Sequence, residues 1–165
     1  MYRIRLNDPC NLRLDGKALI DGTAWDYAYV ELGDPGIPHA VVPVKNLRDF
    51  DTAKLRELGR RLRYYPEFPK GANVNFYEII GADHIYERTY ERGVEDFTYA
   101  CGTGTGSVVT VLTLLGKVSG HQVRVDMTGG QLMVDVEREG NQVTNLYLTG
   151  PTNIVCKGEI TDEAL

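Results

Sequence analysis

The sequence predicts an α+β fold in which a curved, mostly antiparallel sheet wraps around one buried helix. In residues 107–115, apolar side chains occupy every side of a helical wheel, with only Ser and Thr between them. A helix that is apolar all round is buried, and this one is far shorter than the about 20 residues of a membrane span. Many short alternating segments joined by turn residues predict the strands of the enclosing sheet.

The composition is that of one soluble domain covering residues 1–165. With 42% hydrophobic and 25% charged residues, the chain can bury a sizeable core. The net charge of −5 argues against a nucleic-acid partner. No apolar leader opens the chain, and we expect no membrane partner. The three cysteines, Cys10, Cys101 and Cys156, lack metal-ligand spacing, which favours a reducing cytoplasm and no metal site.

The first third of the chain predicts three strands and an amphipathic helix. The alternation of residues 2–6 indicates a half-buried strand. Further strands are expected at residues 25–32 and 39–44, with Pro43 at the end of the latter or on an edge. Residues 51–63 carry leucines at helical spacing, so we expect a helix that is capped by Asp49 or Asp51 and ends before Pro66.

The remaining segments predict more strands on both sides of the apolar helix. Residues 72–80 form one, and residues 84–92 alternate with polar side chains on both faces, which indicates that one face lies against a polar site or an interface. After the helix, Gly-containing turns separate short segments that predict an antiparallel meander. Its strands are expected at residues 122–127, 131–137, 142–148 and 153–157.

The start of the apolar helix has the residue types of an anion-binding site. Cys101 is followed by Gly102, Gly104 and Gly106, and glycine costs about 1 kcal/mol relative to Ala inside a helix. We therefore expect another group to approach this backbone closely. The N–H groups of a first helical turn lack intrahelical partners and favour a carboxylate. The same position is expected to lower the pKa of the Cys101 thiol toward neutrality.

Two other interpretations of this segment remain open. Cys101 is equally compatible with a buried structural cysteine before a Gly-rich turn, although that leaves the glycines unexplained. A phosphate-binding loop is the weaker interpretation, because no Lys-Ser/Thr pair follows the glycines.

Several motifs in this order resemble those of a known enzyme family. The most specific are Tyr-Glu-Arg-Gly at residues 90–93 and Ala-Cys-Gly-Thr-Gly at residues 100–104. Weaker ones are Ile-Pro-His-Ala-Val-Val, Phe-Pro-Lys-Gly-Ala-Asn-Val-Asn-Phe, Leu-Thr-Gly-Pro and Gly-Glu-Ile, which begin at residues 37, 68, 148 and 158. Together they are similar to the C-terminal half of diaminopimelate epimerase, a pyridoxal-independent amino-acid epimerase family.

The resemblance implies a cofactor-independent proton transfer between two cysteines. That family has two similar halves, each with a cysteine at the start of its central helix. One thiolate removes the α-proton of the substrate and the other thiol protonates the opposite face, so the carbon is inverted. The resemblance makes Cys101 one of these two thiols, and it implies no cofactor. Helix-end N–H groups would stabilise the charge that develops on the substrate carboxylate.

The resemblance also implies how the substrate is held. The backbone N–H groups of Gly102 and Thr103 would bind its α-carboxylate, and Glu91 would bind its α-ammonium. Arg92 and Asn73 would bind the distal end, where the family holds a second carboxylate. Without the resemblance, a surface ion pair between Glu91 and Arg92 is the simpler interpretation, and such pairs contribute about 0 to 1 kcal/mol.

The sequence departs from the family pattern in three places. Ile37 stands where the family has an Asn, and the segment before Cys101 is one residue longer and lacks the usual Gly-Glu-Thr, so Glu95 or Asp96 could replace that glutamate. The second Cys-Gly-Asn-Gly motif is absent. We interpret Cys10 as a loop thiol and Cys156 as a small core residue of a strand, neither of them catalytic.

We therefore predict one half of an epimerase that interconverts L,L- and meso-diaminopimelate and is inactive alone. The start at residue 1 on a strand, together with the missing motif, predicts a C-terminal half whose partner is an N-terminal half or a sister subunit, with self-association through the exposed apolar face. One alternative is a diverged racemase for another amino acid. The other is a non-catalytic module that binds a carboxylate.

Overall fold

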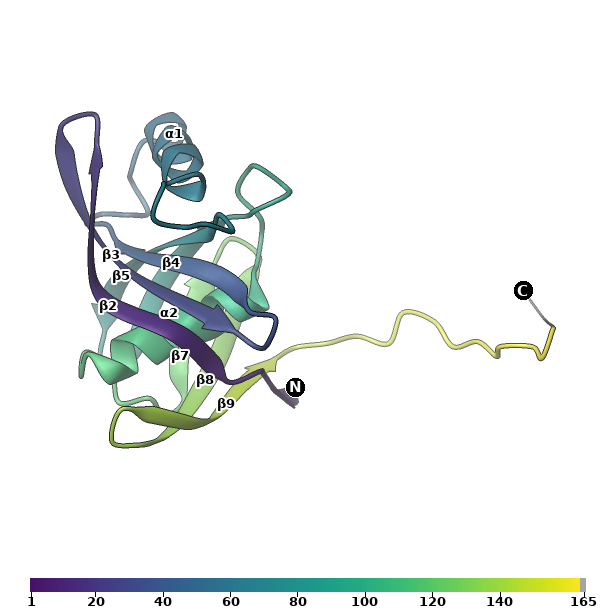
Figure 1. The fold of residues 1–165 in the computed structure, drawn as a ribbon. Helices are drawn as coiled ribbons and strands as arrows, with labels where there is room; N and C mark the ends of the chain where they lie inside the picture. Colours follow the sequence, from purple (N-terminus) through teal and green to yellow (C-terminus); the bar gives the residue numbers. More distant parts are fainter. Residues whose placement is uncertain (164–165) are drawn as a thin grey trace.

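The computed structural model of the chain describes residues 1–163 and confirms the predicted fold class. Nine strands form one strongly curved sheet, and two helices pack on it (Figure 1). The strands are β1 (Tyr2–Arg5), β2 (Pro9–Ile20), β3 (Thr23–Leu32), β4 (Ile37–Pro43), β5 (Asn73–Gly81), β6 (His84–Tyr90), β7 (Val123–Met127), β8 (Gly130–Glu139) and β9 (Gln142–Gly150). The helices are α1 (Thr52–Arg63) and α2 (Gly102–Leu114).

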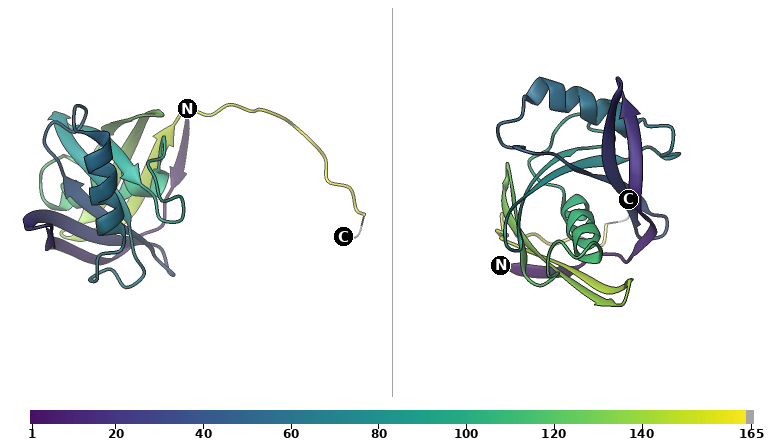
Figure 2. Two further views of the ribbon diagram at one scale, coloured as in Figure 1. Left: turned by 90° about the horizontal axis from the view of Figure 1, so that it is seen from above. Right: turned by 90° about the vertical axis from the view of Figure 1, so that its left-hand side faces the viewer.

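The order of the strands explains where each helix lies. Across the sheet the order is β1-β9-β8-β7-β6-β5-β4-β3-β2, so the first two strands of the chain form its opposite edges. Only β4 with β5 and β6 with β7 pair in parallel. Parallel neighbours need a crossover connection, and these two crossovers contain α1 and α2. In Figure 2 the sheet curls around α2, while α1 lies on the outer side.

Helix α2 is the centre of the inner core, as its composition predicts. Its residues from Gly104 to Thr113 are all buried. Val108, Val109, Val111 and Leu112 pack against apolar side chains from β3 to β9. Because the sheet surrounds the helix, an apolar stripe on one side alone would leave polar groups in the core.

Helix α1 covers the outer face of the sheet. The predicted leucine stripe is buried, and Asp51 is confirmed as the N-cap because its side chain accepts a hydrogen bond from the Lys54 N–H. The outer core contains aromatic rings, among them Phe76 and Tyr90. Neither helix in residues 1–163 is long and apolar enough to cross a membrane.

Two expectations for the strands were wrong, and one strand was missed. Strand β2 was not predicted, because register shifts on either side of Arg13 interrupt its alternation. The strand expected at residues 153–157 does not form, and residues 151–163 are exposed without secondary structure. Strand β1 is present but exposed along its whole length instead of half-buried, since it lies at the edge of the sheet.

The predictions for Cys10 and Cys156 were wrong for the same reasons, a missed strand and a strand that does not form. Cys10 is not in a loop but begins β2, where it is half-buried and its thiol donates a hydrogen bond to the Gly33 carbonyl at 3.3 Å. Cys156 is exposed in the segment after β9 rather than packed in a core strand.

Candidate active site

Cys101 is the N-cap residue of α2, with an extended backbone that turns into the helix at Gly102. Its carbonyl accepts the Thr105 N–H at 2.8 Å and closes the first helical turn. The N–H groups of Gly102 and Thr103 have no intrahelical acceptor at this position. The hydroxyl of Thr103 lies 3.7 Å from the sulfur. Cys101, Gly102 and Thr103 are therefore brought together as the sequence predicts.

The glycines of α2 make room for neighbouring strands of the protein. A Cβ on Gly104 would lie 2.2 Å from the Asn75 side-chain nitrogen and 3.1 Å from the Cys101 sulfur. A Cβ on Gly106 would lie 2.6 Å from a methyl group of Leu6. The close approach that the glycines predict is thus confirmed for these two positions, and the approaching groups are side chains of the chain itself.

The pKa of the Cys101 thiol is raised to about 12, opposite to the expected direction. Burial is the main cause, and the negative charge of Glu91 adds to it. The Gly104 N–H and the Thr103 hydroxyl hydrogen-bond to the sulfur and lower the pKa, but by less. The helix start therefore acts in the predicted direction, yet burial outweighs it, and Cys101 carries its proton at neutral pH.

Glu91 lies just after β6 and presents a carboxylate to the region of the thiol. It accepts a hydrogen bond of 2.6 Å from the Thr98 hydroxyl. Within residues 1–163 no ion pair joins it to Arg92, so the simpler interpretation of a surface ion pair is wrong. An acceptor without a cation beside a helix start suits a substrate ammonium group.

Asn73 and Arg92 are joined to each other. The Asn73 side chain accepts the Arg92 backbone N–H at 2.8 Å and donates to the Pro38 carbonyl at 3.2 Å. The exposed Arg92 guanidinium donates to the Lys70 carbonyl at 3.0 Å. Asn73 therefore holds the backbone of Arg92 in place, and the roles of both residues toward a substrate stay predictions.

A buried polar network lies below these residues and was not identified from the sequence. His39 on β4 is hydrogen-bonded through Nδ1 to the Asn75 side-chain oxygen at 2.9 Å, and Asn75 donates to Glu87 at 2.8 Å. Burial lowers the pKa of His39 to about 4, so the ring is neutral. Its Nε2 atom has no hydrogen-bond partner among the described residues. The sequence signals of this network were the polar residues on both faces of the 84–92 segment and the motifs that contain His39 and Asn75.

The other acidic residues before Cys101 point away from it. Glu95 pairs with Arg63 at 3.1 Å, and Asp96 pairs with Arg56 at 2.7 Å, so both attach this loop to α1. Ile37 begins β4 and is 38% exposed.

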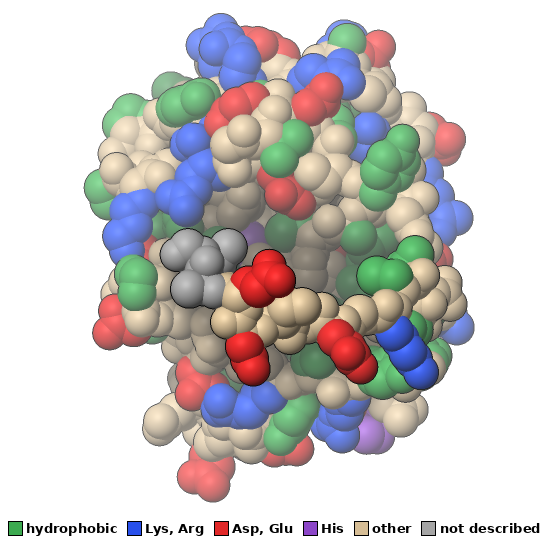
Figure 3. Space-filling view, turned by 90° about the vertical axis from the view of Figure 1, so that its right-hand side faces the viewer, with side chains coloured by type: hydrophobic (Ala, Val, Ile, Leu, Met, Phe, Trp, Pro, Cys, Tyr) green, Lys and Arg blue, Asp and Glu red, His purple; other side chains and the backbone are tan. Residues whose placement is uncertain are grey.

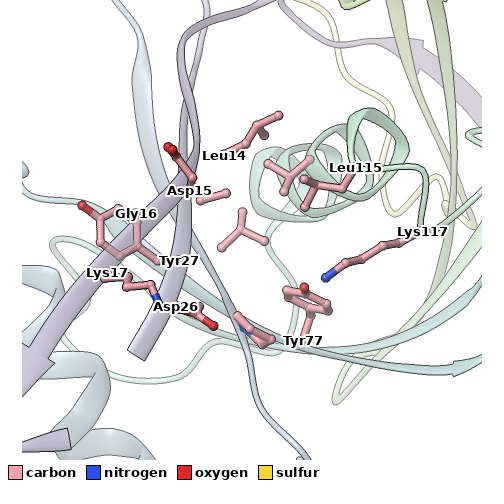
Figure 4. A pocket seen from close by; sticks show the side chains of 13 residues that line it. Leu14, Asp15, Gly16, Lys17, Asp26, Tyr27, Tyr77, Leu115 and Lys117 are labelled. Atoms are coloured by element: carbon pink, nitrogen blue, oxygen red, sulfur yellow. Dashed lines mark ion pairs between the residues drawn. The ribbon is translucent and has the colours of Figure 1, made fainter. Parts of the chain in front are cut away.

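The face at the N-terminal end of α2 is hollowed in its middle (Figure 3). A separate cavity of about 420 Å³ lies at the other end of the helix, where it is lined by residues such as Tyr77, Leu115 and Lys117 (Figure 4). None of the six candidate residues lines that cavity. The candidate site is therefore confined to the N-terminal end of α2.

Solved structures that share this fold include a hydroxyproline epimerase and a probable proline racemase. A hydroxyproline epimerase from Agrobacterium vitis matches with a TM-score of 0.68 and 18% identity over 88% of this chain and 48% of its own. A probable proline racemase from Agrobacterium radiobacter matches with a TM-score of 0.64 and 21% identity, over 88% of this chain and 49% of its own. These likenesses show the fold alone, which the chain shares with about half of each of these two proteins.

Sequence comparison defines the family more closely. The family model of diaminopimelate epimerase matches residues 33–155, and the chain belongs to this family. The diaminopimelate epimerase of Chlorobaculum tepidum is 40% identical over 96% of this chain and 58% of its own length. That of Leptospira biflexa is 37% identical over 86% of this chain and 46% of its own. The chain thus spans about half the length of these relatives.

Proposed function

We propose that the chain is the C-terminal catalytic half of an amino-acid epimerase that interconverts L,L- and meso-diaminopimelate without a cofactor. The observation that supports this most is the position of Cys101, a thiol at the N-cap of a buried helix, near the Glu91 carboxylate, which forms no ion pair within residues 1–163. Family membership supplies the reaction class. The other thiol would come from an N-terminal half or sister subunit, so the chain alone is inactive.

The substrate would be held by its charged groups. Its α-carboxylate would accept the N–H groups of Gly102 and Thr103, where the positive end of the α2 dipole stabilises negative charge. Its α-ammonium would bind Glu91, and its distal carboxylate would bind Arg92. When the α-proton leaves, charge moves onto the α-carboxylate, so the same N–H groups stabilise the carbanion.

Cys101 would give its proton to one face of the carbanion while the partner thiolate takes the proton from the other face. The carbon exchanges one C–H bond for another, and the two sulfurs exchange protonation states. Because the charge of Glu91 raises the pKa of Cys101, an ammonium bound to Glu91 would lower it again. The thiol would then ionise for the reverse reaction with substrate in place.

The test is epimerisation by the chain alone and by the chain co-expressed with the N-terminal half of a family member. Conversion of L,L- to meso-diaminopimelate, measured by chiral chromatography, is expected only for the pair and is expected to disappear in Cys101→Ala. Appreciable conversion by the chain alone would contradict the proposal. A panel of other amino acids run beside it would identify a diverged racemase, which the exposed Ile37 at the start of β4 favours.

The raised pKa of Cys101 favours one second candidate, a non-catalytic module that binds a carboxylate at the start of α2. Such a module needs the free N–H groups but no thiolate. Binding of diaminopimelate by the pair that is unchanged in Cys101→Ala, with no epimerisation in either, would support this candidate over the enzyme.

A further inference from the structure

Glu87 on β6 is a buried carboxyl group whose only described partners are neutral. It is 2% exposed. Its Oε1 accepts hydrogen bonds from the Asn75 amide at 2.8 Å and the Thr89 hydroxyl at 3.0 Å, and its Oε2 accepts the Thr105 hydroxyl at 2.9 Å. A buried charge is normally paired with an opposite charge or neutralised by a proton. Glu87 therefore requires an explanation beyond the packing of the core.

The partners of Glu87 connect it directly to the start of α2. Thr105 lies in the first turn, and its N–H binds the Cys101 carbonyl. Asn75 packs against Gly104. A Cβ on Gly104 would contact both the Asn75 amide and the Cys101 sulfur, so both groups lie on the same side of this glycine. Thr105 thus connects the carboxyl group to the Cys101 backbone, and Asn75 connects it to the Gly104 backbone beside the thiol.

Within residues 1–163, no charged side chain is hydrogen-bonded or ion-paired to Glu87, and its cross-strand neighbour on β5 is Tyr77, a buried phenol whose pKa is raised by burial. Strand β7 contributes Val123 and Val125 to the same inner core. Strand β4 contributes His39, which is neutral and is bonded to Asn75. The negative charge of Glu91 acts on the thiol in the same direction as that of Glu87. The Arg92 guanidinium is exposed and donates to the Lys70 carbonyl. In such surroundings a charge acts over a longer distance than at a surface.

We propose that Glu87 is a positioning residue that tunes the proton affinity of Cys101 in addition to the larger effects of burial and Glu91: its carboxylate helps the thiol to keep its proton, and its protonation makes that proton easier to lose. Each partner hydroxyl can either donate or accept, so the network accommodates Glu87 with or without a proton. Burial raises the pKa of Glu87 to about 7, which places this exchange near neutrality. The catalytic role that this gives Cys101, a thiol that holds a proton ready to donate, rests on the proposed function. The coupling between Glu87 and Cys101 does not rest on it.

The test is the rate of Cys101 alkylation by iodoacetamide in the full chain, resolved by mass spectrometry from Cys10 and Cys156, between pH 5 and 10. Only the thiolate reacts, so for an independent thiol the logarithm of the rate rises with pH in one straight line. In the parent we expect the logarithm of the rate to rise with pH, to flatten near pH 7, where Glu87 ionises and raises the pKa of Cys101, and then to rise again along a parallel line at higher pH. This flattening is the break. Glu87→Gln is expected to abolish the break and to lower the apparent pKa of Cys101 by about one unit.

Glu57→Gln is the matched control, because it also removes one negative charge but from a carboxylate that contacts only Arg60 and Arg61 of α1. It is expected to keep the break. A parent profile without a break overturns the proposal even if Glu87→Gln does not fold, and so does a break that persists in a folded Glu87→Gln variant. No substrate or partner half is needed, so this result is independent of the epimerisation assay.

Discussion

Two buried titratable residues at the site, His39 and Glu87, respond to pH in opposite directions. Burial lowers the pKa of His39 from 6.5 to about 4 in the folded chain. Between these values only the unfolded chain binds the proton, so the contribution of His39 to stability is complete above pH 6.5 and is lost as the pH falls toward 4. Glu87 has a raised pKa in the folded chain, so its contribution falls as the pH rises from 4.5 to about 7.

Replacing His39 by Gln is therefore expected to remove the acid-sensitive part of the stability. Between pH 6.5 and 4, the parent should lose up to roughly 3 kcal/mol of unfolding free energy relative to His39→Gln, since one pKa unit corresponds to 1.36 kcal/mol. Urea unfolding at several pH values measures this difference. His121→Gln is the control, because that side chain is 81% exposed. Parallel pH profiles for the parent and His39→Gln would show that His39 does not titrate as a buried group.

For the residues at the start of α2, the sequence predicted positions in the fold correctly but not pKa values. Cys101 and its glycines could be placed at a helix start because cap position and glycine spacing are local properties. The direction of the thiol pKa could not, because it depends on burial by strands distant in the sequence. Glu87 was missed for the same reason: a Glu in an alternating segment is ordinary until β5 and α2 close over it.

The packing of the N-terminal turn of α2 depends on Gly104, which has no side chain. Gly104→Ala would add a helix-favouring residue, worth about 1 kcal/mol, but its Cβ would meet the Asn75 amide. We expect overpacking to exceed that gain, with a net loss of about 1 to 3 kcal/mol. The Asn75 contact to Glu87 should also break and alter the alkylation profile of Cys101. Chemical denaturation and the alkylation assay measure the two effects.

Gly106→Ala is the control on the same helix, since its Cβ would meet only apolar side chains, Leu6 and Leu146, and would leave the Asn75 contact to Glu87 intact. It is expected to leave the Cys101 profile unchanged. Equal effects of both substitutions on that profile would mean that the polar contact under Gly104 has no special role.

The elements were predictable where a local pattern was complete. Helix α2 was identified from its composition and α1 from its leucine stripe and Asp51 cap. Strand β2 was missed because bulges near Arg13 interrupt its alternation. The segment at residues 153–157 looks like a strand, but a strand also needs a neighbour to pair with, and local sequence does not contain that information.

At the scale of the whole molecule, the α2 start faces outward from a sheet that supplies one side of a site. Several large apolar side chains of this domain are exposed, including Tyr99 at 75% and Tyr2 at 59%. We propose that a second half-domain covers part of this surface and brings the second thiol. The match to about half of each relative's length is compatible with this arrangement. The family was predictable from its motifs, because they are short, ordered and specific.

The most direct test of the central claim is incorporation of solvent deuterium at the α-carbon of L,L- and meso-diaminopimelate, measured by NMR. It uses the chain paired with a family N-terminal half, in parent and Cys101→Ala forms. Our account predicts exchange into both epimers by the parent pair and none by the chain alone. In the Cys101→Ala pair, exchange is expected to be lost from the epimer whose α-proton Cys101 removes. Undiminished exchange from both epimers in the Cys101→Ala pair would show that another group transfers the proton and would contradict the account.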